Sequence, residues 1–209
     1  MLKKAAFSLL FSTSLSFSAF AGSVNVEPGG GYSGVGTTPT SLGAFSVGDN
    51  QIFGSNGSTA GIRDYVTFTV PNGLFLTQLV ILNTTPLGNV GFIGLEAGNQ
   101  LTLLPSTVTA AGLLGWHHYT SAEAAAQTNI LPLMAVPANG SSGFIQPLGP
   151  GDYTLWIQDS SDSSVSGPFQ YGFDVKLAVP EPATWGISLA ALAGLALLAK
   201  RKNGSAAAR

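Results

Sequence analysis

The side chains best suited to chemistry in this 209-residue chain are two histidines and a set of scattered carboxylates. His117 and His118 are the only histidines, and they are adjacent. Neighbouring side chains on a strand point to opposite faces, so these two cannot readily bind one ion. No His-Glu-x-x-His motif is present, and no spacing suggests a third ligand. We therefore expect structural histidines, and we predict no metal site and no cofactor.

The carboxylates do not form a recognisable catalytic pattern. Asp159-Ser160-Ser161-Asp162 could offer oxygen ligands to calcium, but it lacks the alternating acidic spacing and the distal glutamate of a calcium loop. The chain has no cysteine and no Gly-x-Ser-x-Gly elbow, so no thiol or elbow-type serine nucleophile is indicated. No spacing supports a glycosidase-like pair, and we predict no enzymatic activity. The carboxylates considered for such a pair are Asp64, Glu96, Glu123 and Asp152.

Aromatic side chains suggest an alternative function for the body of the chain. Trp116 and Tyr119 stand close together, and Trp156 lies on the polar face of a predicted strand. An exposed row of these three rings would favour a module that binds exopolysaccharide or another glycan, because aromatic rings can stack on sugars. Buried rings would instead form the second face of a covered strand. The sequence leaves both interpretations open.

Short apolar runs with a period of two, separated by turn residues, predict an all-β body. The clearest runs are Asp64 to Val70, Val90 to Ala97, Tyr153 to Gln158 and Phe169 to Leu177, and a further run is expected at Gln100 to Leu104. Ile130 to Val136, which contains Pro132, is expected to be an edge or irregular segment. The one helical stretch is Ser121 to Gln127, with Ser121 as its N-cap.

These elements predict one antiparallel β-sandwich or jelly roll over residues 41–178, with eight to ten short strands. Residues 22–40 are rich in Gly, Pro, Ser and Thr, and we expect a flexible leader or an irregular first edge there. Without disulfides, the domain must be stabilised by its core alone, and its length is sufficient for that.

The charge of the body excludes one class of partner. The whole chain carries a net charge of −2, but residues 22–179 hold two basic and nine acidic residues, which gives 2 − 9 = −7. Phosphate backbones require clustered Lys and Arg, so the sequence predicts that the body does not bind nucleic acid. The two basic residues are Arg63 and Lys176.

The first 21 residues have the order of an export signal peptide. Lys3 and Lys4 precede a short apolar region that runs to Phe17, and Ala19 and Ala21 supply the small residues that signal peptidase requires. We expect cleavage before Gly22 and export of the rest of the chain through the inner membrane.

Residues 179–209 have three parts in a fixed order. Pro180-Glu181-Pro182 is stiff and extended, because each proline fixes its own φ angle. The apolar run 183–199 contains 17 residues. As a transmembrane helix it would be about 26 Å long, enough to cross a hydrocarbon core. Lys200-Arg201-Lys202 follows on the side predicted to be cytoplasmic, and Trp185 lies near the opposite boundary.

This arrangement resembles the PEP-CTERM sorting signal of Gram-negative bacteria. The resemblance rests on Pro180, Glu181 and Pro182, the apolar run and the basic cluster 200–202, together about 24 residues. It implies processing near the Pro-Glu-Pro motif by exosortase, a membrane-embedded protease, after transient anchoring in the membrane. It also implies delivery to the cell surface or extracellular matrix. We therefore expect a non-catalytic structural or adhesive protein there, with glycan binding as the alternative and hydrolysis as a more distant one.

Overall fold

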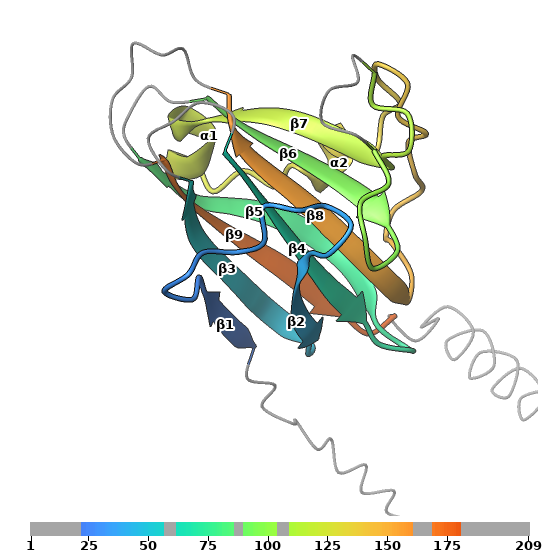
Figure 1. The fold of residues 1–209 in the computed structure, drawn as a ribbon. Coiled ribbons are helices and arrows are strands. Elements are labelled where there is room, and N and C mark those ends of the chain that lie inside the picture. The colour runs from blue at the N-terminus through green and yellow to red at the C-terminus, as the bar shows by residue number, and fades with distance from the viewer. Residues whose placement is uncertain (1–21, 57–61, 86–89, 104–108, 161–168, 181–209) are drawn as a thin grey trace, which may run out of the picture.

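The structure is a computed structural model that describes residues 22–56, 62–85, 90–103, 109–160 and 169–180. Two β-sheets pack face to face in this part of the chain (Figure 1). The four-stranded sheet has the order β1-β3-β9-β5 and the five-stranded sheet the order β2-β4-β8-β6-β7. The strands are β1 (Ser23–Val26), β2 (Thr40–Ala44), β3 (Gly48–Asn56), β4 (Arg63–Val70), β5 (Phe75–Thr85), β6 (Val90–Ala97), β7 (Gly115–Thr120), β8 (Gly151–Asp159) and β9 (Phe169–Ala178).

The predicted all-β architecture is confirmed, and its period-two strands lie where the sequence placed them. Every second residue of β9 is buried between the sheets, in the order Phe169, Tyr171, Phe173, Val175, Leu177. The inward residues of β4, β6 and β8 complete this core from the other sheet. Burial of these apolar side chains on both inner faces supplies the main stabilisation of the two layers.

Cross-strand pairs of an aromatic residue and a glycine set the close packing inside the sandwich. Tyr171 lies opposite Gly54 on β3, and Tyr119 lies opposite Gly91 on β6. At either glycine an added Cβ would overlap the tyrosine ring. The missing side chains therefore leave the space that each ring occupies, which pins the register of both strand pairs.

The prediction of purely antiparallel sheets is wrong at one edge of each sheet. β1 pairs in parallel with β3, and β2 pairs in parallel with β4, while the other strand pairs that the structure describes are antiparallel. The chain reaches β2 from β1 by crossing from one sheet to the other. Period-two patterns do not encode strand direction, so the sequence could not distinguish these edges.

Residues 22–40, which were expected to form a flexible leader or an irregular first edge, include a strand at the edge of the four-stranded sheet. They contain β1, and the side chain of Tyr32 is buried and donates a hydrogen bond to the carbonyl oxygen of Phe53 at 3.3 Å. Glu27 accepts hydrogen bonds from the backbone N–H and the hydroxyl of Ser55. Contacts with β3, rather than a local apolar pattern, order this segment.

Two short helices connect the strands. α1 (Ser121–Ala125) matches the predicted helical stretch, but its N-cap is Thr120 rather than Ser121. Thr120 and Glu123 form a capping box, in which each side chain bonds to the backbone N–H of the other residue. α2 (Leu131–Met134) occupies the segment predicted to be an edge, and Pro132 fits its first turn because that position needs no N–H donor. The run expected at Gln100 forms no strand over its described residues, 100–103.

The predicted signal peptide and the predicted transmembrane helix 183–199 lie outside the described residues. Neither of the two helices that the structure does describe has the length and apolar character needed to cross a membrane.

A truncation series will test whether residues 22–40 belong to the folded unit. We expect a fragment 22–178 to unfold in one cooperative transition without disulfides. A fragment 41–178 lacks β1 and the buried Tyr32, so it should lose about 3 kcal/mol or more in the free energy of unfolding. Urea unfolding followed by circular dichroism measures the difference. Equal stability of the two fragments would show that the segment is a leader after all.

Candidate ligand-binding pocket

The two histidines diverge as predicted from their adjacency on β7. His117 faces α1, where its Nε2 lies 2.9 Å from Oε1 of Glu123. His118 is exposed on the opposite, outer face of the five-stranded sheet. Partial desolvation of the ring and the neighbouring His117 lower the pKa of His118, so its ring is mainly neutral at pH 7. The two histidines therefore contact different parts of the structure: His117 contacts α1, and His118 lies on the outer face of the five-stranded sheet.

Each of the candidate carboxylates accepts hydrogen bonds from partners of its own. Among the described residues, no group of three or more His, Asp or Glu side chains could hold a metal ion. Asp162, from the segment considered and set aside for calcium, lies outside the described residues. These carboxylates thus act as local hydrogen-bond acceptors: Asp64 for Tyr171, Glu96 for Thr102, Glu123 for Thr120 and His117, and Asp152 for Thr69.

A row of aromatic rings crosses four neighbouring strands on the outer face of the five-stranded sheet. The ring centroids of Tyr65 and Trp156 are 6.1 Å apart, and those of Trp156 and Phe92 are 4.8 Å apart. Phe92 lies 6.1 Å from Trp116 and 5.4 Å from His118. The pairs are tilted, stacked or edge-on at distances typical of favourable aromatic contacts, so the rings support one another in fixed positions.

The segment after β6 covers part of this row. Leu101, Ala110 and Leu113 are buried against Tyr65 and Trp156, and they form a second apolar cluster outside the main core. A sheet normally presents polar residues on its outer face, but this cover buries an apolar patch there as well. Where the cover ends, rings that are only partly buried remain beside it.

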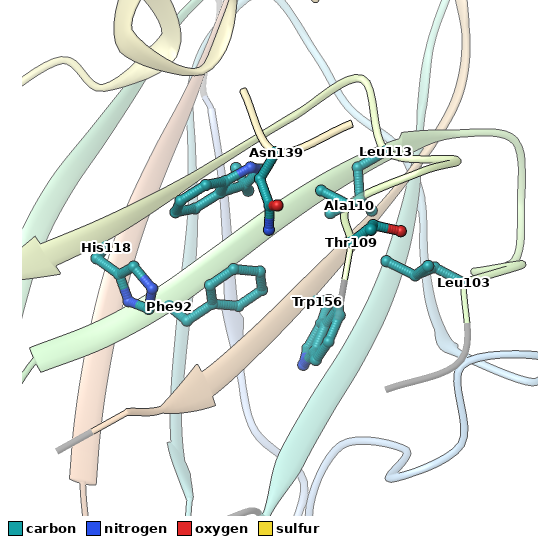
Figure 2. Close-up of a pocket in the computed structure, with 9 residues that line it drawn as sticks. Phe92, Leu103, Thr109, Ala110, Leu113, His118, Asn139 and Trp156 are labelled. Atoms are coloured by element: carbon teal, nitrogen blue, oxygen red, sulfur yellow. The ribbon is translucent and has the colours of Figure 1, made fainter. Parts of the chain in front are cut away.

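A pocket of about 140 Å³ opens at that place (Figure 2). Figure 2 shows Phe92, His118 and Trp156 on the sheet side, with Leu103 and Leu113 on the covering segment. Its volume is below the roughly 300–1,000 Å³ of sites that enclose a drug-sized ligand, so it suits one ring or one face of a ring. Thr109, Ala110, Trp116 and Asn139 complete the lining.

The polar edges of the pocket are fixed by the surrounding chain. Nε1 of Trp116 donates a hydrogen bond to the carbonyl oxygen of Ala138 at 3.0 Å, which holds the indole in place. The carboxamide of Asn139 points into the pocket (Figure 2). No Asp, Glu, Lys or Arg is among the described residues that line it. The arrangement therefore offers apolar ring faces with a few neutral hydrogen-bonding groups at the rim, which is the chemistry of a binding site for a neutral, amphipathic ring.

The exposed row of Trp116, Tyr119 and Trp156 that would have favoured a glycan-binding module is not formed. Tyr119 is fully buried between the sheets, and Trp156 is only 8% exposed, so the prediction of an exposed Trp156 is wrong. Trp116 does line the pocket, together with Phe92, which the sequence reasoning missed. The alternation in β6 carried that signal, since Phe92 falls on the face opposite Ile93 and Leu95.

The predicted sorting and processing residues lie mostly outside the described residues. Pro180 is exposed just beyond β9. Gly22 directly precedes β1, and a Cβ added to it would overlap the carbonyl oxygen of Asp49 on β3. The structure does not describe Ala19, Ala21, Glu181, Pro182, Trp185, Lys200, Arg201 and Lys202.

Comparison of the chain with protein-family models, with curated proteins and with solved structures gives no match.

The buried carboxyl of Asp64 makes the stability of the domain depend on pH. Tyr171 donates a hydrogen bond to Asp64 at 2.7 Å and so links the two sheets. Burial raises the pKa of Asp64 to about 6, although the hydrogen bond from Tyr171 acts in the opposite direction. The protonated form is therefore favoured in the fold. Its stabilising contribution is complete below about pH 4, the ordinary carboxyl range, and is lost as the pH rises through about 6.

We expect Asp64→Asn to remove this dependence, because an amide stays neutral and can still accept the hydrogen bond from Tyr171. At pH 8 the variant should be more stable than the wild-type chain by on the order of 1 kcal/mol, and the difference should shrink at pH 5. Thermal melts at the two pH values measure this. Asp152→Asn, at an exposed position on β8, is the control. If the Asp64→Asn variant keeps the wild-type dependence of stability on pH, the assignment of that dependence to Asp64 is refuted.

Proposed function

We propose that this protein is an exported, non-catalytic surface or extracellular-matrix protein whose β-sandwich adheres to glycans through the aromatic pocket. The observation that carries the proposal is the pocket of Phe92, Trp116, His118 and Trp156 on the outer face of the five-stranded sheet. Aromatic rings pack against the apolar faces of pyranose rings, while amide and imidazole groups exchange hydrogen bonds with the hydroxyls. A purely structural sandwich remains the alternative, and a hydrolase is a weaker one.

Delivery to the surface is the second part of the proposal. It rests on the signal-peptide pattern of residues 1–21 and on the resemblance of residues 179–209 to a PEP-CTERM sorting signal. Signal peptidase would release the chain before Gly22, and the helix 183–199 would hold it in the inner membrane until an exosortase acts near Pro180-Glu181-Pro182. We also propose that the β-sandwich is a jelly roll.

Glycan binding can be tested with a neutral glucose tetrasaccharide and the exopolysaccharide of the native host. Trp116→Ala removes a partly buried ring from the pocket wall without opening the main core, so we expect binding to weaken at least tenfold. Isothermal titration calorimetry measures the affinity, and a thermal melt checks folding. Phe53→Ala, on the outer face of the other sheet, is the matched control and should bind as the wild-type chain does. Equal binding by the Trp116 variant, or no binding by the wild-type chain, would refute adhesion through this pocket.

Processing can be tested in the native host. Proteases bind their substrates in extended form, and two prolines around one acid hold that form at low entropic cost. Glu181→Ala should leave export and folding intact while the full-length chain accumulates in the membrane. Replacing Lys200, Arg201 and Lys202 with Gln should also impair sorting, because the cations fix the depth of the helix. The measurement is the C-terminal mass of the mature protein. An intact C-terminus at Arg209, in cells with active exosortase, would reduce the segment to a plain anchor.

A further inference from the structure

A second hollow of about 260 Å³ adjoins the aromatic pocket on the same face of the molecule. Its walls are the segment 34–37, the segment 101–103, and the side chains of Arg63 and Tyr65 from β4. Leu103 lines both hollows. The ring of Tyr65 belongs to the second hollow and lies 6.1 Å from the ring of Trp156, which belongs to the first. The two hollows thus follow one another along the row of aromatic rings.

Tyr65 lines this hollow, and its hydroxyl is buried without a hydrogen-bond partner among the described residues. The residue is only 1% exposed, and within the described part of the chain its hydroxyl has no hydrogen-bond partner. A buried hydroxyl normally has a partner, because leaving it unpaired is costly. Burial also raises the pKa of Tyr65, so the group is a neutral hydroxyl that can both donate and accept. The hydroxyl oxygen itself has almost no accessible surface, so it does not reach a ligand in the hollow.

Arg63 places a positive charge beside the same hollow. Its Nε donates a hydrogen bond to Oε1 of Gln158 at 2.9 Å, and its guanidinium lies 5.9 Å from the ring centroid of Trp156. These contacts orient the planar group, and the ion pairs seen among the described residues do not include it. An oriented guanidinium with donors to spare matches a carboxylate in shape and charge.

Arg63 differs from the other basic residue of the body in its ion pairing. Residues 22–179 contain one other basic residue, Lys176, on the four-stranded sheet. Lys176 is already paired with Asp49 at 2.9 Å and with Asp174 at 3.1 Å. Glu96 lies under the covering segment, where it accepts hydrogen bonds from Thr102, and it does not line the hollow. Arg63 is therefore the one place on this acidic body where an anionic group would meet a positive charge that is not already neutralised by a described partner.

We infer that the ligand is an acidic oligosaccharide that spans both hollows. A neutral sugar ring lies against Phe92 and Trp116, and an adjoining sugar directs its carboxylate to Arg63. This inference rests on the proposed glycan-binding function and adds the chemical class of the glycan. Neighbouring strands are about 4.8 Å apart, close to the length of one pyranose residue, so the steps from β6 to β8 to β4 suit successive sugars in a chain.

The test uses the full-length chain and two tetrasaccharides that differ in charge alone. One alternates glucose with glucuronate, and the other is its carboxyl-reduced form, in which every residue is glucose. We expect the acidic form to bind at least tenfold more tightly in calorimetry at low salt, and this preference to diminish as salt is added. Arg63→Gln should abolish the preference, and Arg63→Lys, which keeps the charge but loses the planar fork, should retain part of it. Lys176→Gln is the matched control and should keep the full preference.

The outcomes separate this inference from the proposed function. Equal binding of both tetrasaccharides by the wild-type chain would leave the aromatic pocket as a glycan site but overturn the assignment of an acidic ligand. An unchanged preference in Arg63→Gln, or an equal loss in Lys176→Gln, would likewise overturn the role of Arg63. If the wild-type chain binds neither tetrasaccharide, both proposals are overturned. Thermal melts of each variant exclude misfolding as the cause, and Arg63→Lys preserves the test if Arg63→Gln fails to fold.

Discussion

The inward face of β9 is the constraint on which the rest of the structure depends. Its five alternate apolar side chains are at most 2% exposed, and the strand lies between β3 and β5 in its own sheet. One of the five, Tyr171, also reaches across the core to Asp64 on β4. Hydrophobic burial thus holds the sheets together, and one buried hydrogen bond fixes how they are aligned. If the sheets shifted and left these two groups buried but unpaired, the cost in free energy would exceed the contribution of the bond itself. The hydrogen bond therefore makes the alignment specific.

The five-stranded sheet differs from an ordinary solvent-facing sheet because a connection folds back over it. Trp156 illustrates the consequence, since it is part of the second apolar cluster and also a wall of the pocket. The same packing that stabilises this face therefore shapes the candidate site. The rings on the sheet side of the pocket stand on paired strands and are already held in place, so they lose little conformational entropy on binding.

The sequence predicted the parts of the fold that depend on local alternation. β6 was placed with its observed bounds, and β4 and β9 were placed to within one residue at each end. It missed the elements that form through distant contacts, namely β1, the parallel edges and the ordered segment around Tyr32. For the site, it predicted the divergence of His117 and His118, but it misplaced Trp156. Alternation shows which residues share a face, but exposure of that face depends on what folds over it.

Composition alone does not reveal the role of Arg63, because net charge does not record where a single cation lies. A body with two basic and nine acidic residues suggests repulsion of anionic ligands, and that holds for the averaged long-range field. Binding, however, is decided within a few ångströms, where screening is weak and geometry controls the interaction. Gln158 and Trp156 orient the guanidinium at the second hollow, which Arg63 lines. An acidic surface with one oriented cation would therefore admit a carboxylate at this position and disfavour it over the rest of the body, which favours a single binding register over loose adsorption.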